Sequence, residues 1–296
     1  MTYKAGFVTF WGRPNTGKST LLNRILGQKI SIVTNKPQTT RRMVKGILSR
    51  PDGQIVFIDT PGLHQPIDGL STFMAKQAQE ALQGVDALLY LTTPEKGFHD
   101  DLFYLDTLQS LPCPVFLVVN KRDLFSAEVI HTVINTLSAS FSFQETMVIS
   151  SLTGEGLESL LSAIMFILPE NPPYYDPEIL TDIYERDIAG EIIREKIWDL
   201  VRQEVPYGVE VRVEEFKERG EVIYIQAIIY VERESHKGIL IGDKGKMIKK
   251  IGQEARKDLQ LFLGKKVYLD LWVKTLINWR KKSEVLKRWG YQSPSS

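Results

Sequence analysis

Cysteine is almost missing from this sequence of 296 residues, and Cys113 is its single occurrence. A lone thiol excludes an internal disulfide framework and fits a reducing compartment, where we expect Cys113 to act as a small hydrophobic residue beside a strand. Long apolar runs are missing too, since none approaches the roughly 18 residues needed to span a bilayer. The opening residues, MTYKAGFVTFWG, contain neither a basic region nor a cleavage site. We therefore expect a cytoplasmic protein, with peripheral membrane contact left open.

Net charge is nearly absent as well, at +1, but this value hides two charged blocks. Residues 1–168 carry 14 basic and 14 acidic side chains. Residues 169–234 carry 8 basic and 17 acidic side chains, whereas residues 235–296 carry 15 basic and 5 acidic ones. A basic surface of that size favours a polyanionic partner, although two blocks packed against each other would explain the same split.

The order of apolar segments predicts two domains. In residues 1–168 short apolar strands alternate with amphipathic helices, which is typical of an α/β domain with a mostly parallel sheet and helices on both faces. Four prolines then crowd together, at positions 169, 172, 173 and 177, so residues 169–178 are the predicted linker. Residues 179–296 contain helical stretches and alternating strands, an α+β pattern that ends in a basic tail.

A glycine-rich stretch directly after the first predicted strand fits the pattern GxxxxGK[ST]. It reads Gly12-Arg13-Pro14-Asn15-Thr16-Gly17-Lys18-Ser19, with Thr20 next. Glycines let backbone N–H groups turn toward phosphates, the lysine neutralises phosphate oxygens, and the serine offers a hydroxyl to Mg²⁺. The pattern predicts a site for a nucleoside triphosphate.

A second motif, FIDTPG, places Asp59 at the end of a strand, followed by Thr60, Pro61 and Gly62. The Asp59 carboxylate can hold the Mg²⁺ shell, and the N–H group of Gly62 can meet a γ-phosphate. We therefore expect this turn to complete the phosphate site.

A third motif, VVNKRD, places Asn120, Lys121 and Asp123 at the end of a later strand. Nucleotide sites in such sheets form at the carboxyl ends of the strands. The Asp123 carboxylate can accept hydrogen bonds from the N1–H and N2–H₂ groups that guanine has and adenine lacks. The three motifs together predict GTP and GDP as the bound nucleotides.

These motifs resemble those of the Era family of bacterial ribosome-assembly GTPases, part of the TrmE-Era-EngA-like group. The segments PQTTRR and DTPGLH and a KH-like second domain extend the resemblance over essentially the whole chain. The resemblance implies that Thr40, rather than Thr39, senses Mg²⁺ and the γ-phosphate, so that Ser19, Thr40 and Asp59 hold the metal. It also implies catalytic roles for Lys18, Thr40, Asp59 and Gly62, and a loop of Ser150, Ser151 and Leu152 that closes over the base.

Hydrolysis is expected to be slow without help. Leu63 stands where Ras-like enzymes place the glutamine that orients the attacking water, and leucine cannot do this. His64 is expected to be a loop residue rather than a base. Asn15 resembles the asparagine that recruits K⁺ in related GTPases, so we expect K⁺ as a further cofactor.

The stretch KGILIGDKGKMIKKIG, residues 237–252, carries five lysines against one aspartate. KH domains use such a GxxG turn to clamp the backbone of about four nucleotides of RNA. A glycine turn between two core helices is the alternative, but the order of elements resembles a type II KH domain. The expected RNA contacts are Ile239, Ile241, Gly242, Asp243, Lys244, Gly245, Lys246, Lys249, Lys250, Lys281 and Lys282.

The resemblance implies that the partners are the 3′ end of 16S ribosomal RNA and the 30S subunit, and we expect a monomer. Two alternatives stay open: a GTPase whose basic tail lies on anionic lipid, and an RNA-binding module that no longer switches. Trp279 and Trp289 are expected to pack the last helix onto the sheet, with base stacking as the alternative.

Overall fold

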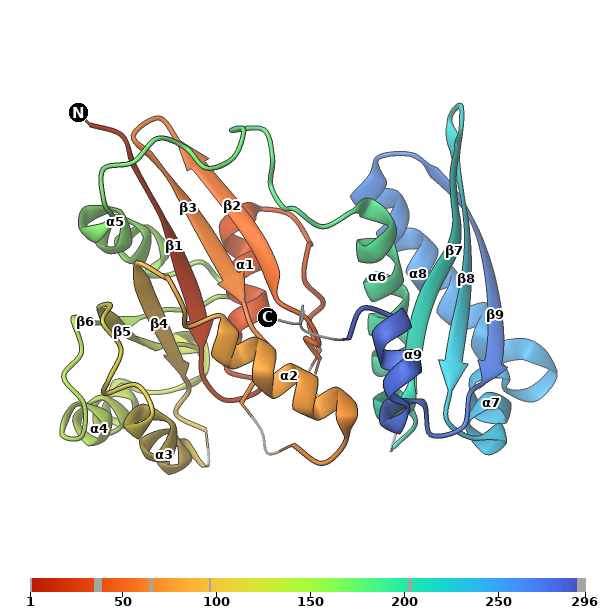
Figure 1. The fold of residues 1–296 in the computed structure, drawn as a ribbon, viewed down its shortest axis with the longest axis horizontal. Helices are drawn as coiled ribbons and strands as arrows, with labels where there is room; N and C mark the ends of the chain where they lie inside the picture. The colour runs from red at the N-terminus through yellow and green to blue at the C-terminus, as the bar shows by residue number, and fades with distance from the viewer. Residues whose placement is uncertain (1, 35–38, 64–65, 96, 202–203, 292–296) are drawn as a thin grey trace. The chain divides into compact units, whose positions relative to one another are not determined.

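The structure, a computed structural model, describes residues 2–34, 39–63, 66–95, 97–201 and 204–291. The chain forms two compact units (Figure 1). The first unit consists of residues 1–31, 40–65 and 74–182, and the second of residues 32–39, 66–73 and 183–296. Two short segments from the first half of the sequence therefore belong to the second unit.

The first unit is built on a six-stranded sheet with the strand order β2-β3-β1-β4-β5-β6. The strands are β1 (Lys4–Trp11), β2 (Val44–Arg50), β3 (Gly53–Asp59), β4 (Ala87–Thr92), β5 (Val115–Val119) and β6 (Glu145–Val148). Only the β2–β3 pair is antiparallel among these strands. The predicted mostly parallel sheet is confirmed, and β3, β4 and β5 are buried along their whole length.

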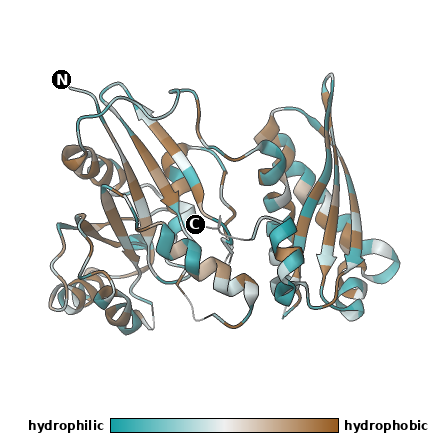
Figure 2. Ribbon diagram, viewed as in Figure 1, coloured by the Kyte–Doolittle hydropathy of each residue, from teal (hydrophilic) through white to brown (hydrophobic). Residues whose placement is uncertain are grey.

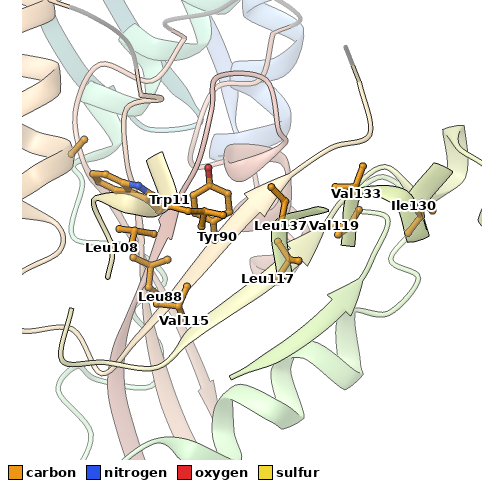
Figure 3. Packing of buried hydrophobic residues seen from close by; sticks show 12 residues of the cluster. Trp11, Leu88, Tyr90, Leu108, Val115, Leu117, Val119, Ile130, Val133 and Leu137 are labelled. Atoms are coloured by element: carbon orange, nitrogen blue, oxygen red, sulfur yellow. The ribbon is translucent and has the colours of Figure 1, made fainter. Parts of the chain in front are cut away.

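Helices follow the strands in alternation, as the α/β pattern predicts. They are α1 (Lys18–Leu26), α2 (Gly69–Glu80), α3 (Asp101–Asp106), α4 (Ala127–Ser138) and α5 (Leu157–Ile167), with the short turns η1 (Phe98–Asp100) and η2 (Arg122–Leu124). Figure 3 shows one core cluster, in which Trp11 and Tyr90 from β1 and β4 gather with Leu117 of β5 and Leu137 of α4. This packing fixes the strands whose carboxyl ends carry the nucleotide motifs.

The proline-rich segment after α5 lies along the first sheet. Gln54 donates a hydrogen bond of 2.8 Å to the carbonyl oxygen of Tyr175 and accepts one of 2.8 Å from the N–H group of Tyr174. Lys45 forms an ion pair of 3.1 Å with Asp182. These contacts explain why residues up to 182 belong to the first unit.

The second unit contains a three-stranded sheet with the order β7-β8-β9. The strands are β7 (Glu210–Arg219), β8 (Val222–Val231) and β9 (Lys266–Thr275), and the helices are α6 (Glu185–Leu200), α7 (Glu234–Ile241), α8 (Lys246–Leu263) and α9 (Ser283–Arg288), with the short turns η3 (Val205–Gly208), η4 (Asp243–Gly245) and η5 (Trp279–Lys281). The strand β7 is antiparallel to β8, and β8 is parallel to β9. The α+β order expected of a KH domain is confirmed, and Figure 2 shows hydrophobic residues along these strands.

The C-terminal tail is part of the core of the second unit. Trp279 is fully buried and donates a hydrogen bond of 2.9 Å to the carbonyl oxygen of Gly208. The ring of Trp289 packs edge-on against Trp279, with ring centroids 5.2 Å apart. The prediction that the tryptophans pack the last helix onto the sheet is confirmed for Trp289, whose ring centroid lies 4.9 Å from that of Tyr230 in β8. Base stacking by the two rings is excluded because both are buried.

Candidate nucleotide site and RNA interface

The glycine-rich loop joins β1 to α1 in the conformation that its glycines require. Gly12 and Gly17 have φ angles of 139° and 95°, which side-chain-bearing residues rarely adopt. A Cβ atom at Gly17 would lie 2.2 Å from the amide nitrogen of Asn120. The loop therefore lies close to the third motif because position 17 has no side chain.

Lys18 is buried beneath this loop, and its ammonium group donates hydrogen bonds to the carbonyl oxygens of Gly12 at 3.0 Å and Arg13 at 2.8 Å. Burial lowers the pKa of Lys18 to about 8, while the nearby carboxylates of Asp59 and Asp101 raise it. A nucleotide phosphate at the start of α1 would favour the charged amine.

Four oxygen-bearing side chains meet beside Lys18. Ser19 donates a hydrogen bond of 2.6 Å to Asp59 Oδ2, and its hydroxyl oxygen lies 2.9 Å from that of Thr40. Ser31 also donates to Asp59 Oδ2, at 2.9 Å. The hydroxyl of Thr39 is instead 2.7 Å from that of Thr34, so the structure places Thr40 rather than Thr39 at this cluster.

The other oxygen of Asp59, Oδ1, is buried and has no hydrogen-bond partner among the described residues. Burial raises the pKa of Asp59, although Ser19 and Lys18 oppose the shift. A buried carboxylate oxygen next to two hydroxyls suits a hard cation such as Mg²⁺, which prefers oxygen ligands and retains ligands from phosphate and water. The residues present therefore fit Mg²⁺. Within the described part of the chain no cluster of three or more histidine, cysteine or acidic residues offers another metal site.

The DTPG turn lies against the phosphate loop. Thr60 is buried and donates a hydrogen bond of 2.7 Å to the carbonyl oxygen of Phe10, and Pro61 is buried beside it. A Cβ atom at Gly62 would lie 2.9 Å from Cα of Pro14. Gly62 thus stands next to the loop that would hold the phosphates, and His64 lies outside the described residues.

Asn120 joins the loops that surround the base site. Its side-chain amide donates a hydrogen bond of 2.8 Å to the carbonyl oxygen of Thr16. Its oxygen accepts hydrogen bonds from the N–H group of Ser151 at 2.9 Å and from the Ser151 hydroxyl at 3.0 Å. The second serine of this loop, a departure from the family pattern, therefore adds a bond to Asn120.

The carboxylate that is predicted to read the base, Asp123, accepts a hydrogen bond of 2.5 Å from the hydroxyl of Ser150, which orients it. Asp123 is exposed, so its edge can meet a base. Lys121 adopts a positive φ of 63° and forms an ion pair of 2.6 Å with Glu95, while Leu152 is exposed. Among the remaining predicted residues, Asn15 is exposed with φ of 64°, and Thr20 is half-buried in α1.

Asp101 is a site residue that sequence reasoning missed. It is fully buried, accepts hydrogen bonds from Arg13 Nε at 2.8 Å and the Tyr90 hydroxyl at 2.9 Å, and forms a third with Thr92. The backbone carbonyl oxygen of Arg13 accepts a hydrogen bond from Lys18, and the side chain of Arg13 binds Asp101. The Asp101 carboxylate therefore holds the glycine-rich loop in place through Arg13. No motif marks this aspartate, which follows Asp100 in an ordinary acidic pair.

The GxxG turn between α7 and α8 has the positive φ angles that its glycines predict. Gly242 and Gly245 have φ angles of 72° and 77°, and Lys244 between them has φ of 48°. A Cβ atom at Gly242 would lie 2.7 Å from Cβ of Met247. A Cβ atom at Gly245 would meet no atom within 4 Å, so the space beside Gly245 is open where α8 begins, a position that favours phosphate.

The predicted RNA contacts fall into two groups around and beyond this turn. Lys244, Lys246, Lys249 and Lys250 are exposed, Asp243 forms an exposed ion pair of 3.0 Å with Lys246, and such pairs contribute little stability. Ile239 is 46% exposed and Ile241 is half-buried, which leaves an apolar edge beside the lysines. Lys281, the last residue of η5, and Lys282, directly before α9, are exposed, and no described contact links them to the turn.

Two protein families match the chain in the same order as the two units. Residues 7–121 match the family described as 50S ribosome-binding GTPase, and residues 204–280 match the KH domain family. The GTPase Era of Caldanaerobacter subterraneus subsp. tengcongensis is 47% identical over 294 residues, covering 98% of this chain and 99% of the relative. The GTPase Era of Halothermothrix orenii is 44% identical and covers 99% of this chain and 100% of the relative.

Solved structures agree with these relatives. An Aquifex aeolicus Era variant bound to GDP and AlF4− matches with a TM-score of 0.93 and 37% identity, covering 98% of this chain and 100% of that one. An Era in complex with MgGDPNP and nucleotides 1506–1542 of 16S ribosomal RNA matches with a TM-score of 0.93, 38% identity and the same coverage. This chain therefore belongs to the Era family of GTPases.

Proposed function

We propose that this protein is a molecular switch that binds GTP, hydrolyses it to GDP, and binds the 3′ end of 16S ribosomal RNA during assembly of the 30S subunit. Residues 1–168 would serve as the nucleotide domain, 169–178 as the linker and 179–296 as the RNA-binding domain. The observation that carries the proposal is the cluster of Ser19, Thr40 and Asp59 in a chain that also presents a lysine-rich GxxG turn.

Each side chain of the nucleotide site has a role in this proposal. Lys18 would neutralise charge on the β- and γ-phosphates, and Asn120 would hold the loops around guanine while Asp123 reads its edge. Ser19, Thr40 and Asp59 would hold Mg²⁺, which supplies positive charge against the phosphates. Loss of the γ-phosphate would release Thr40 and Gly62, and this release is the switching event.

Slow hydrolysis follows from Leu63, which cannot orient a water molecule. We propose that K⁺, recruited near Asn15, supplies charge that an arginine supplies in other GTPases. The test is single-turnover hydrolysis in KCl and in NaCl at equal ionic strength. Faster turnover in KCl for the wild type but not for Asn15→Ala supports the K⁺ site, and equal rates in both salts would exclude it.

RNA binding would use the GxxG turn, whose backbone and lysines suit phosphate, with Ile239 and Ile241 against the bases. The related Era structure with nucleotides 1506–1542 of 16S ribosomal RNA supports binding of this RNA by the protein. The test is RNA affinity with GDP and with a non-hydrolysable GTP analogue, at one fixed salt concentration. The probe is a short strand that matches the 16S 3′ end, with a scrambled strand as control.

Tighter and sequence-selective binding in the GTP-analogue state would support the switch. Equal binding of both strands in both states would leave a GTPase with a basic, unselective tail. The protein would act as a monomer in the cytoplasm.

Peripheral membrane contact finds little support in the tail. No helix in the described residues is long and apolar enough to cross a membrane. The apolar side chains Trp279, Leu286 and Trp289 of the tail are buried, so they offer lipid no hydrophobic face. Co-sedimentation with anionic vesicles would test this point, and stronger retention by vesicles than by RNA would reverse our preference.

A further inference from the structure

The three-stranded sheet of the second unit has one face that its helices leave largely open, although Tyr230 at one end of this face packs against Trp289, with ring centroids 4.9 Å apart. Along β8 the side chains of Ile223, Ile225, Ala227 and Ile229 are buried, and the residues between them point to the opposite face. Residues paired directly across neighbouring strands share a face. We call the face opposite the buried isoleucines the outer face.

Aromatic rings line this outer face. Tyr224 of β8 pairs with Tyr268 of β9, and their rings stack with centroids 5.7 Å apart and planes 19° apart. Tyr268 is 63% exposed, and Trp272, two positions further along the same face, is 55% exposed. The guanidinium of Arg219 lies 5.3 Å from the Tyr224 ring centroid. Flat groups of a ligand could stack on these exposed rings, as Arg219 already does on Tyr224.

The orientation of Trp272 is held by its neighbours. Its indole N–H group donates a hydrogen bond of 2.9 Å to Asp270, and Gln226 donates to the same carboxylate oxygen at 3.3 Å. These polar contacts fix the ring without burying it. A ring held in place loses little conformational freedom when a flat ligand stacks on it.

Charge on the outer face is mainly positive. The cations that the strand pairing places there are Arg212, Lys217, Arg219, Lys266 and Lys274. The anions are Glu210, Glu215 and Asp270. Glu210 is buried and forms an ion pair of 3.7 Å with Arg212, Glu215 forms one of 2.8 Å with Lys217, and Asp270 binds Trp272 and Gln226. This balance favours a polyanion with flat apolar groups, and single-stranded RNA has both.

We propose that the outer face is a second RNA surface, which stacks bases on Tyr224, Tyr268 and Trp272 and holds phosphates with the surrounding cations. The inference rests on the proposed RNA binding and extends it beyond the GxxG turn. Other RNA-binding sheets stack two or three bases on aromatic residues in the same way. A protein partner fits less well because charged residues are depleted at the core of protein interfaces, and a second copy would bring cations against cations.

The test compares two double variants with the wild type. Tyr268→Ala with Trp272→Ala removes two rings, whereas Tyr268→Phe with Trp272→Phe keeps an aromatic ring at both positions. Leu261→Ala is the matched control, since Leu261 is an exposed apolar side chain, 87% exposed, on α8. The probe is RNA with the sequence of nucleotides 1506–1542 of 16S ribosomal RNA, measured by filter binding at one salt concentration.

We expect the alanine pair to weaken RNA binding at least about tenfold, and the phenylalanine pair and Leu261→Ala to stay within about threefold of the wild type. The variants must keep the wild-type thermal midpoint and basal GTP hydrolysis, so that a loss of binding reports on the surface.

Three results would overturn the inference. Unchanged RNA binding by the alanine pair would limit RNA to the GxxG turn. If the alanine pair bound RNA normally but was no longer retained on small ribosomal subunits, the outer face would bind a protein of the subunit instead of RNA. A wild-type dimer in light scattering that the alanine pair disperses would assign it to a second copy. If the wild type itself bound no RNA, the proposed RNA-binding function would be wrong. That result differs from a wild type that binds RNA and an alanine pair that binds it equally well, which would overturn only the inference about the outer face.

Discussion

Arg194 donates a hydrogen bond of 2.6 Å to the carbonyl oxygen of Thr39, the residue directly before the threonine that lies beside Ser19. Arg194 is fully buried in α6 and also binds the Glu191 carboxylate. Thr39 belongs to the second unit and Thr40 to the first, so one peptide bond joins a residue that α6 binds to a residue of the Ser19–Thr40–Asp59 cluster. This peptide bond links the candidate nucleotide site covalently to the unit that contains the KH domain.

Replacing Arg194 with alanine should therefore weaken binding of a GTP analogue about tenfold, because a hydrogen bond to a charged group contributes about 1.5–3 kcal/mol. GDP affinity should change little, since Thr40 has no γ-phosphate to sense in that state. Equilibrium titration of both nucleotides with the pure variant measures the difference. Arg194→Lys is the control that keeps the charge. An equal loss for GDP and the analogue would show that Arg194 acts only on overall stability.

Asp101→Asn should loosen the phosphate loop. The substitution removes the negative charge that pairs with Arg13 below the loop, and breaking a buried ion pair typically costs about 3–5 kcal/mol of stability. We expect a lower urea midpoint and weaker binding of GDP and GTP alike. Tyr90→Phe removes one hydrogen bond to the same carboxylate and should cost only about 1 kcal/mol. Nucleotide affinities equal to the wild type in Asp101→Asn would contradict a supporting role.

Nucleotide binding should depend on pH through Lys18, whose pKa burial lowers from 10.5 to about 8. Phosphates favour the charged amine, so binding above this pKa must take up a proton, and GDP affinity should fall by up to about tenfold per pH unit there. Calorimetry in buffers of different ionisation enthalpy measures the uptake. A flat affinity between about pH 7 and 9 would show that Lys18 stays charged in the nucleotide-free protein.

The free energy of unfolding of the nucleotide-free protein should also depend on pH through Lys18. It should rise with pH, whereas nucleotide affinity falls. The unfolded chain binds more protons than the folded one between the two pKa values of Lys18, about 8 and 10.5. The free energy of unfolding that this lysine contributes should thus rise with pH over that window. Urea titrations at several pH values, compared with Lys18→Met, isolate the contribution of the amine.

Gly242→Ala should abolish most RNA binding and leave basal GTP hydrolysis unchanged. The added Cβ would lie 2.9 Å from the backbone nitrogen of Met247, so the start of α8 must shift. Gly220→Ala is the matched control, because Gly220 also has a positive φ, 59°, but a Cβ there meets no atom within 4 Å. Filter binding should show a loss of at least about tenfold for the first variant only. Equal losses in both variants would point to backbone strain alone.

The sequence predicts the nucleotide site well because its residues lie in short, ordered motifs. Spacing alone brings Lys18 and Ser19 to one helix start, and strand order brings Asp59 beside them. The predicted base site follows in the same way, since Asn120 directly follows β5 and Ser151 follows β6 by three residues, and the two side chains meet at one edge of the sheet.

Contacts between residues that are far apart in the sequence and belong to no motif could not be predicted in this way. Asp101 and Arg194 are fully buried ionic residues without a motif, and only the folded chain brings them to Arg13 and Thr39. The stack of Tyr224 on Tyr268 depends on the register between β8 and β9, strands that are separated by two helices in the sequence. A shift of one residue would move one ring to the buried face.

The uneven burial of the tryptophans gives the protein an intrinsic optical probe. All five tryptophans lie in the described residues, and four of them, Trp11, Trp198, Trp279 and Trp289, are at most 5% exposed. Trp272 alone among the five is open to water, so red-shifted emission and quenching by acrylamide should report on the outer face of the sheet. The unlabelled protein can thus signal in real time when that face is covered.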